Sequence, residues 1–175
     1  TKVGYWPERI AAWERGEKIA PITMDIALSR ACQMACRWCY ASLQASEGRV
    51  ITREIALQFL SDAAEVGVKG VSLISDGESS LVPFYADAIT HGAKVGLQIG
   101  IGTNGQRLRR PLLEQILPHL CYLRFNFSAG TREGYVRIMG ARPEWYDEVI
   151  QNIADAMAIK RRDRLDVTVN MQLVC

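Results

Sequence analysis

The chain has 175 residues, 49% of them hydrophobic, so it can bury one core and we expect one globular domain. Its apolar runs fall far short of the roughly 20 residues that span a bilayer, so no membrane segment is predicted. The net charge is only +2, and the basic clusters at 107–110 and 160–162 fall at predicted helix ends, so we expect no nucleic-acid partner.

Residues 1–21 are predicted to form a leader that precedes the main domain at 22–175. Pro7 suits the first turn of a short helix and Gly16 suits its end, because proline has a helical φ and glycine accepts the left-handed conformation that follows a helix. Pro21 then interrupts the chain. We expect the leader helix to pack across the strands of the main domain.

A strand followed by a cysteine-rich loop begins the main domain. Residues 22–28 alternate like a strand entering a core, and Cys32, Cys36 and Cys39 follow at a C-x₃-C-x₂-C spacing. Cysteine thiolates bind iron–sulfur clusters, normally four to a cubane, so three cysteines leave one iron open to a small molecule. The short gaps let three thiolates converge from a single loop. This spacing predicts a [4Fe–4S] cluster bound by these three residues.

Two other cysteine chemistries fit the loop less well. Structural zinc needs four ligands, usually in paired knuckles, and neither His91 nor His119 lies near enough in sequence to complete such a pair. Disulfides suit an oxidising compartment, yet the chain has five cysteines, an odd number, and shows no signal peptide. We therefore expect a reducing, cytoplasmic location, and we predict that Cys121 and Cys175 are buried thiols outside the cluster.

The cysteine loop resembles that of the radical S-adenosylmethionine (radical SAM) enzymes. In that family the loop follows the first strand of a barrel and carries an aromatic residue before its last cysteine, where this chain has Trp38. The resemblance implies that SAM binds the open iron, and that one electron from the cluster cleaves SAM to methionine and a 5′-deoxyadenosyl radical, which takes hydrogen from a substrate. It also places Trp38 and Tyr40 beside the cofactors.

Predicted helices and strands alternate after the loop. Helices are expected after Thr52, from Tyr85 to near Gly92, at 111–117 and along 146–157, and strands at 71–75, 94–101, 122–127 and 165–174. Ile55 and Ile150 are expected in the buried stripes of the first and last of these helices. The alternation favours parallel βα units with the helices outside. We therefore predict an α/β fold, a partial (βα) barrel of the radical SAM type with about five parallel strands, and a site at their C-terminal ends.

The turn after the second of these strands carries the first polar motif. Ser75-Asp76-Gly77-Glu78 resembles the family's Gly-Gly-Glu motif, whose backbone and carboxylate hold the SAM ammonium. Glu78 is expected to accept charge-assisted hydrogen bonds and Gly77 to allow close backbone approach, with Asp76 in place of the first glycine. Taken alone, these residues would suit an ordinary Asp-Gly turn.

The next two strands end in polar motifs of their own. Thr103 and Asn104 belong to a Thr-Asn-Gly sequence that is common in the family, and we expect them to line the site or to shape its loop. Asn126 and Ser128 alternate onto one side of the fourth strand, towards the barrel interior. Both could hydrogen-bond a ribose hydroxyl or the SAM carboxylate.

This region also resembles peptide-modifying relatives that have a SPASM extension, and we predict a SPASM-related subset. Their Ser-Leu-Asp-Gly sequence stands where Asn126 and Ser128 stand here, and an arginine near the equivalent of Met139 grips the SAM carboxylate. In this chain Arg137, two residues earlier, is the candidate for that contact.

The fifth predicted strand is the last. On it Asn170 and Gln172 share a face that points either into the barrel or to solvent, and the pattern leaves both open. Family barrels usually have six strands, so a sheet that ends here would have an unpaired edge and an open pocket wall. We therefore expect a further C-terminal region or another chain to complete it.

The sequence thus predicts a radical SAM enzyme that abstracts hydrogen from a ribosomal peptide or from a sugar or nucleoside, with flavodoxin or ferredoxin as an electron donor. Two other classes stay open. A non-catalytic iron–sulfur electron carrier would not need the motifs at 76–78 and 126–128. A zinc-stabilised interaction module would be distinguished by metal analysis. The residues that select a substrate usually lie in loops and extensions, so the substrate itself is not predicted.

Overall fold

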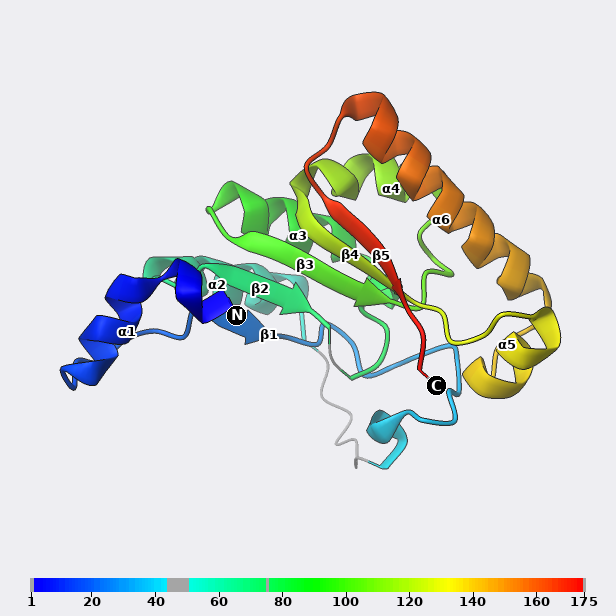
Figure 1. Cartoon of the computed structure of the whole chain (residues 1–175), viewed down its shortest axis with the longest axis horizontal. Helices are drawn as coiled ribbons and strands as arrows, with labels where there is room; N and C mark the ends of the chain where they lie inside the picture. The colour runs from blue at the N-terminus through cyan, green and yellow to red at the C-terminus, as the bar shows by residue number, and fades with distance from the viewer. Residues whose placement is uncertain (1, 44–50, 75, 175) are drawn as a thin grey trace.

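The computed structural model of the chain describes residues 2–43, 51–74 and 76–174, which fold around one parallel sheet. Its strands are β1 (Thr23–Asp25), β2 (Gly70–Leu73), β3 (Gln98–Thr103), β4 (Leu120–Asn126) and β5 (Thr168–Gln172). The five strands lie side by side in chain order, and each neighbouring pair is parallel (Figure 1). The predicted α/β fold with about five parallel strands is therefore confirmed.

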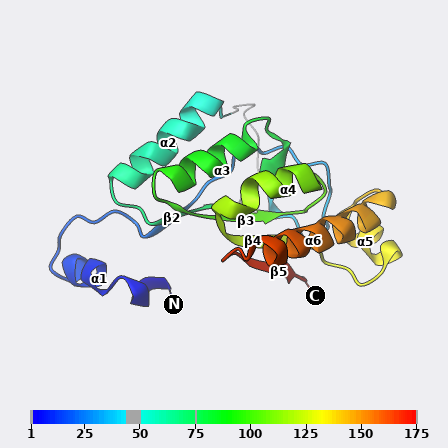
Figure 2. The same cartoon turned by 90° about the horizontal axis from the view of Figure 1, so that it is seen from above.

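Helices cover one face of this sheet. The α-helices are α1 (Pro7–Glu14), α2 (Arg53–Glu65), α3 (Tyr85–Lys94), α4 (Arg110–Ile116), α5 (Arg132–Met139) and α6 (Glu144–Asp163). Figure 2 shows α2, α3, α4 and α6 together on one side of the strands, with α1 on the other side. Crossovers between parallel strands are right-handed, which places the connecting helices on one face and leaves the other available for a site. No helix among the described residues is both long and apolar enough to cross a bilayer.

Alternation along the strands separates an apolar face from a more polar one. The helix-covered face carries side chains that are at most 2% exposed: Val71, Leu73, Ile99, Ile101, Leu123 and Phe125. The opposite, open face carries Ser72, Gly100, Gly102, Tyr122, Arg124 and Asn126. Complete burial of a large apolar side chain contributes about 1.5–3 kcal/mol, so the core under the helices stabilises the sheet while its open face remains available for binding.

Several strand boundaries differ from the sequence prediction. The first strand, predicted at 22–28, is only Thr23–Asp25, the residues that pair in register with β2. The helix α3 continues to Lys94, and the turn that follows uses Gly96 at φ +90°, so β3 begins at Gln98 and not at residue 94. The last strand is shorter than the predicted 165–174, because only Thr168–Gln172 pairs with β4. Ser75, predicted to end the second strand, lies outside the described residues.

Two helix faces also differ. Ile55 is 58% exposed and Ile150 is 43% exposed, so their predicted places in the buried stripes are wrong. The residues buried in α2 and α6 are Ala56, Leu60 and Ala63, and Val149, Asn152, Ala156 and Ile159. Neighbouring residues on a helix point about 100° apart, so the sheet's contacts select a face one residue away from the predicted one.

The leader is attached near the amino ends of the strands. The guanidinium of Arg9 in α1 donates hydrogen bonds to the backbone oxygens of Ala20 (3.0 Å) and Gly67. The ammonium of Lys69 lies 5.1 Å from the centre of the Trp6 ring, a cation–π contact. These contacts hold the leader beside the start of β2, at the opposite end of the sheet from the predicted site.

Cys121 is exposed, so the prediction that it is buried is wrong. It lies near the amino end of β4, next to the register shift at Ile99 and Gly100, and its Sγ lies 3.3 Å from the backbone oxygen of Ile99. The sheet alternation does not bury it at this irregular end of the strand. Cys175 lies outside the described residues.

Candidate cofactor site at the strand ends

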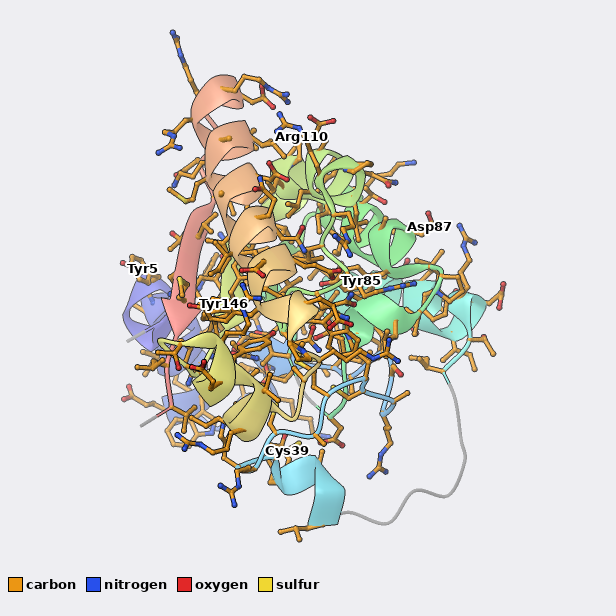
Figure 3. All side chains as sticks on the ribbon, turned by 90° about the vertical axis from the view of Figure 1, so that its right-hand side faces the viewer. Tyr5, Cys39, Tyr85, Asp87, Arg110 and Tyr146 are labelled. Atoms are coloured by element: carbon orange, nitrogen blue, oxygen red, sulfur yellow. The ribbon has the colours of Figure 1, made fainter. Side chains whose placement is uncertain are left out.

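The cysteine loop is fixed by α5, a helix that is not among the predicted ones. The backbone nitrogens of Ala35 and Arg37 donate hydrogen bonds to the backbone oxygens of Met139 (3.2 Å) and Ile138 (2.9 Å). Figure 3 views the molecule from the end to which the strands of Figure 1 point, and labels Cys39 on this loop. The last turn of α5 therefore holds the loop at the carboxyl ends of the strands.

A glycine makes this contact possible. Gly140 follows α5 at φ +57°, and a Cβ atom there would lie only 2.5 Å from the backbone oxygen of Ala35. Such an approach and such a φ both favour glycine. At the other end of α5, Thr131 caps the helix by accepting a hydrogen bond from the Gly134 nitrogen (3.1 Å).

A cavity of about 630 Å³ lies at the carboxyl ends of the strands, and Cys32, Cys36 and Cys39 all line it. The same wall contains six more of the residues predicted for the site, which are Trp38, Tyr40, Gly77, Glu78, Asn104 and Asn126. The fold thus brings together side chains from the cysteine loop, from the turns after β2 and β3, and from the end of β4.

The three thiols share this wall and are partly buried there. Burial raises the pKa of the Cys32 thiol, and burial together with the neighbouring Cys32 and Cys39 raises the pKa of Cys36 to about 11. Among the described residues no three His, Cys, Asp or Glu side chains are already grouped as a metal site. Three thiols facing one cavity nevertheless fit the ligand set of an iron–sulfur cluster, and the Asn104 amide, 3.8 Å from Cys32 Sγ, is placed to donate to a sulfur.

Glu78 is the most connected polar residue of the site. It is 3% exposed, and its Oε1 accepts hydrogen bonds from the hydroxyls of Ser80 (2.7 Å) and Thr103 (2.8 Å). Its Oε2 accepts one from the backbone nitrogen of Asn104 (2.8 Å), and its own nitrogen donates to the Ala31 oxygen (2.8 Å). No cationic side chain pairs with this carboxylate within the part of the chain that the structure describes, so a cationic ligand in the cavity would complete it.

Gly77 combines the turn and the close approach that were predicted for it. Its φ is +73°, and a Cβ atom would lie 2.4 Å from the backbone oxygen of Ser29. The chain therefore turns here directly against the loop that precedes the cysteines. The side chain of Asp76, which precedes this turn, does not line the cavity.

Three other predicted residues lie behind or beside the cavity wall. Thr103 is 1% exposed and its hydroxyl also accepts from the Gly105 nitrogen (3.0 Å), so it supports the wall from behind. Ser128 is 2% exposed and accepts from the Val174 nitrogen (3.1 Å). Arg137 is exposed on α5 and does not line the cavity.

The structure also identifies residues at the site that were not predicted. Met139 Sδ lies 4.0 Å from Cys36 Sγ, and the Gln33 amide donates to Asn104 Oδ1 (3.3 Å). Asn152 is 2% exposed and donates to the Gly105 oxygen (2.8 Å), which holds the turn after β3. Its signal in the sequence is a polar residue three positions after Val149 on the buried face of α6.

Two residues of the last strand, whose direction the sequence left open, lie on the open face of the sheet. Gln172 pairs in register with Asn126 and lines the cysteine cavity. Asn170 is exposed and donates a hydrogen bond to the Tyr122 hydroxyl (3.2 Å). Of the two, only Gln172 is part of the wall.

Known proteins resemble this chain in sequence and in fold. The S-adenosylmethionine-dependent nucleotide dehydratase of Flammeovirga pacifica is 24% identical over 119 residues, which are 65% of this chain and 40% of that protein. The solved structure of anSMEcpe with bound AdoMet has a TM-score of 0.68 at 15% identity, and covers 87% of this chain and 43% of its own. The structure of Streptococcus suis SuiB bound to S-adenosylmethionine has a TM-score of 0.63 at 17% identity. That match covers 96% of this chain and 45% of the SuiB chain.

The chain spans less than half the length of these relatives, and at such identities the solved structures show a shared fold. The family itself is shown by sequence. The model of the Radical SAM superfamily matches residues 26–174, from directly after β1 through the cysteine loop to just past the end of β5, and the chain therefore belongs to the radical SAM superfamily.

Proposed function

We propose that this chain is the cofactor-binding core of a radical SAM enzyme. Cys32, Cys36 and Cys39 hold a [4Fe–4S] cluster, and the ammonium of SAM binds Glu78. The observation that carries the proposal is the buried Glu78 carboxylate, which lines the cysteine cavity and has no cationic partner among the described residues. When bound, the cluster supplies the single electron that cleaves SAM to methionine and a 5′-deoxyadenosyl radical, which abstracts hydrogen from a substrate.

The chain's own residues bind and orient the cofactors. Glu78 accepts hydrogen bonds from the SAM ammonium, and Gly77 lets the backbone approach it closely. Asn126 hydrogen-bonds the ribose or the carboxylate, while Trp38 and Tyr40 shield the cavity mouth. Charge-assisted hydrogen bonds are short and strong, so Glu78 is the dominant contact of this set.

The remaining predicted residues have supporting roles. Thr103 and Asn104 position the Glu78 carboxylate through the hydrogen bonds described above. Ser128 holds the chain after β5, and Asp76 shapes the turn before Gly77. Arg137 would reach a SAM carboxylate only if its exposed side chain turned towards the cavity.

The substrate is a peptide or a small molecule such as a sugar or nucleoside. A solved structure of SuiB is bound to the precursor peptide SuiA, which supports the first, and the nucleotide dehydratase of F. pacifica supports the second. We place the protein in a SPASM-related subset and in the cytoplasm, with flavodoxin or ferredoxin as the electron donor. A reducing compartment preserves the thiols as ligands.

Anaerobic reconstitution tests the cluster and the chemistry together. Wild-type protein loaded with iron and sulfide should bind about four irons and should form 5′-deoxyadenosine from SAM after reduction with dithionite, as measured by mass spectrometry. Cys36→Ala should lose the intact cubane and the product. Cys121→Ala is the matched control, because Cys121 does not line the cysteine cavity. A full cubane in Cys36→Ala would show that the ligand assignment is wrong.

The same experiment separates the two alternative classes. An iron–sulfur electron carrier would bind the cluster but would neither bind nor cleave SAM. A zinc-stabilised module would contain zinc and would lack the visible absorption of a cluster. Either result would overturn the proposed function.

A further inference from the structure

Arg124 places a positive charge on the open face of the sheet, beyond the residues already assigned to the cofactors. Arg124 lies on β4 two residues before Asn126. At about 3.3 Å per residue, Arg124 is therefore about 7 Å further than Asn126 from the carboxyl end of the strand. Its side chain lines the cysteine cavity and also a second cavity of about 850 Å³ nearer the amino ends of the strands. Ile74 and Arg124 line both cavities, so Arg124 lies where they meet.

A glycine on the neighbouring strand, Gly102, makes room for this side chain. Gly100 and Gly102 of β3 both face the open side, and Gly102 pairs in register with Arg124. A Cβ atom at Gly102 would lie 3.2 Å from Nη2 of Arg124 and 2.9 Å from Cγ1 of Ile74. The guanidinium therefore lies against the backbone of β3, in space that a larger residue would occupy.

The guanidinium has no partner among the described residues. Its Nε is buried without a hydrogen bond, and no carboxylate in the part of the chain that the structure describes forms an ion pair with it. Glu78, the buried carboxylate of the same cavity, accepts hydrogen bonds from Ser80, Thr103 and Asn104, and none from Arg124 is seen among the described residues. A guanidinium has five N–H donors, and a cation removed from water is stable only when an anion or acceptors satisfy it.

We propose that Arg124 binds an oxyanion of the substrate, a carboxylate or a phosphate. This inference rests on the proposed function, which places SAM at the strand ends against Glu78 and Asn126. The planar fork of arginine pairs with two oxygens of either group, so it fixes orientation as well as position. An anion bound by Arg124 would lie two residues further from the strand ends than Asn126. It would therefore hold the substrate on the side of SAM that faces the amino ends of the strands. The SAM carboxylate is the other possible source of the same chemistry.

Simple anions test the site without a known substrate. Cluster-loaded wild type, Arg124→Gln and Arg161→Gln are melted in phosphate, in acetate and in potassium chloride of equal ionic strength. Arg161 is the matched control, because it is an exposed arginine near the end of α6. Phosphate or acetate should raise the unfolding midpoint of wild type and Arg161→Gln above that in chloride, but not that of Arg124→Gln. The dissociation constant of the stabilising anion should rise at least tenfold in Arg124→Gln and stay within twofold in the control.

A second readout is specific to a half-buried charge that has no partner among the described residues. Without added phosphate or acetate, Arg124→Gln should unfold at the same temperature as wild type or at a higher one, since the substitution removes a cation that has no partner. Arg124→Lys keeps the charge and loses the fork, so its anion affinity should be intermediate. This second variant keeps the test decisive if Arg124→Gln folds poorly.

Calorimetry with SAM distinguishes the two sources of the anion. All variants should bind SAM within twofold of wild type if Arg124 serves the substrate. A tenfold loss of SAM affinity in Arg124→Gln would assign Arg124 to the SAM carboxylate and would overturn the substrate assignment. A wild type that responds to neither phosphate nor acetate, or an equal response in Arg124→Gln, would overturn the site itself. Failure of the proposed function is separate, because it would appear as a wild type that binds no cluster or no SAM.

Discussion

At the scale of single residues, Glu78 connects parts of the chain that are far apart in sequence. Its backbone contacts Ala31 before the cysteine loop, and its side chain contacts Thr103 and Asn104 after β3. Through its backbone and its carboxylate, this one residue connects the turns after β2 and β3 with the loop of the cysteines, and it also lines their cavity. The carboxylate accepts four hydrogen bonds, because the Ser80 nitrogen also donates to it (3.2 Å), and removing it would leave those donors without an acceptor.

Glu78→Gln should weaken SAM binding by about tenfold to a hundredfold, because losing a charged hydrogen bond costs about 1.5–3 kcal/mol. Calorimetry on cluster-loaded protein measures the effect. Glu54→Gln, which changes an exposed carboxylate in the first turn of α2, is the control. Unchanged SAM affinity in Glu78→Gln would rule out the role assigned to Glu78.

Tyr135 should make the free energy of unfolding depend on pH in the alkaline range. It packs against Phe127 (ring centres 4.9 Å apart) and Tyr146 (5.7 Å), and its hydroxyl lies 3.9 Å from Met34 Sδ. Burial raises the pKa of Tyr135 above its usual value, with smaller contributions from Cys36 and Glu148. The phenol therefore stays protonated in the folded state at a pH where the unfolded chain already loses that proton. The stability is complete below the unfolded pKa of about 10 and falls as the pH rises above it.

Tyr135→Phe should consequently lose less stability than wild type between about pH 8 and about pH 10.5. Urea unfolding at the two pH values gives the difference in free energy of unfolding. Tyr40→Phe is the control, because Tyr40 is 59% exposed and should behave like wild type. The same pH dependence in Tyr135→Phe and wild type would contradict the assignment.

At the scale of secondary structure elements, α5 links the cysteine loop to the sheet. The helix is only eight residues long, yet its last turn receives two backbone hydrogen bonds from the loop. Its capping residues, Thr131 and Gly140, set its two ends. Because short helices are marginal in isolation, this one depends on the packing of Tyr135 and Met139 in the core. The position of the cysteines therefore depends on the tertiary packing of a segment a hundred residues later.

Gly140→Ala should displace the loop and reduce both stability and cluster occupancy. An alanine there would keep an unfavourable positive φ and would place its Cβ against the Ala35 oxygen. Such strain costs on the order of 1–3 kcal/mol. Iron content and urea unfolding measure the two effects. Gly130→Ala is the matched control, since no atom lies within 4 Å of its Cβ position, and equal iron content in both variants would argue against the role of this contact.

At the scale of the whole molecule, one face of the sheet forms the core and the other borders the proposed binding site. The helices bury the apolar face, whereas the open face borders cavities of about 630 and 850 Å³. A ligand that fills such a face adds its binding free energy to that of folding.

SAM at a hundred times its dissociation constant should therefore stabilise the cluster-loaded protein by about 2.7 kcal/mol. For a domain of this size, that corresponds to a rise of about 5–10 °C in the unfolding midpoint. Thermal unfolding with and without SAM measures the shift, and Glu78→Gln should show a smaller one at the same SAM concentration. No shift in a protein shown to contain the cluster would contradict the proposed SAM site.

Local patterns in the sequence determined the class of fold and the candidate ligands. The cysteine spacing and the alternation of strand and helix are visible within windows of a few to about twenty residues, because thiol convergence in a loop and the periods of 2 and 3.6 are local properties. Hence the parallel α/β fold and the motifs at Cys32–Cys39, Gly77-Glu78 and Asn104 could be predicted without coordinates. The helical period alone does not determine which face of a helix is buried. For this reason the predicted burial of Ile55 and Ile150 is wrong.

The tertiary structure alone decided which of these motifs meet and what surrounds them. The contact between Gly140 and Ala35, the hydrogen bond from Thr103 to Glu78, and the unpaired guanidinium of Arg124 each depend on atoms that are distant in the chain. Hydrogen-bond satisfaction and charge pairing are properties of all neighbours in space, and a local window does not contain those neighbours. For this reason Arg124 is an ordinary strand residue in the sequence and becomes a candidate binding residue only in the folded protein.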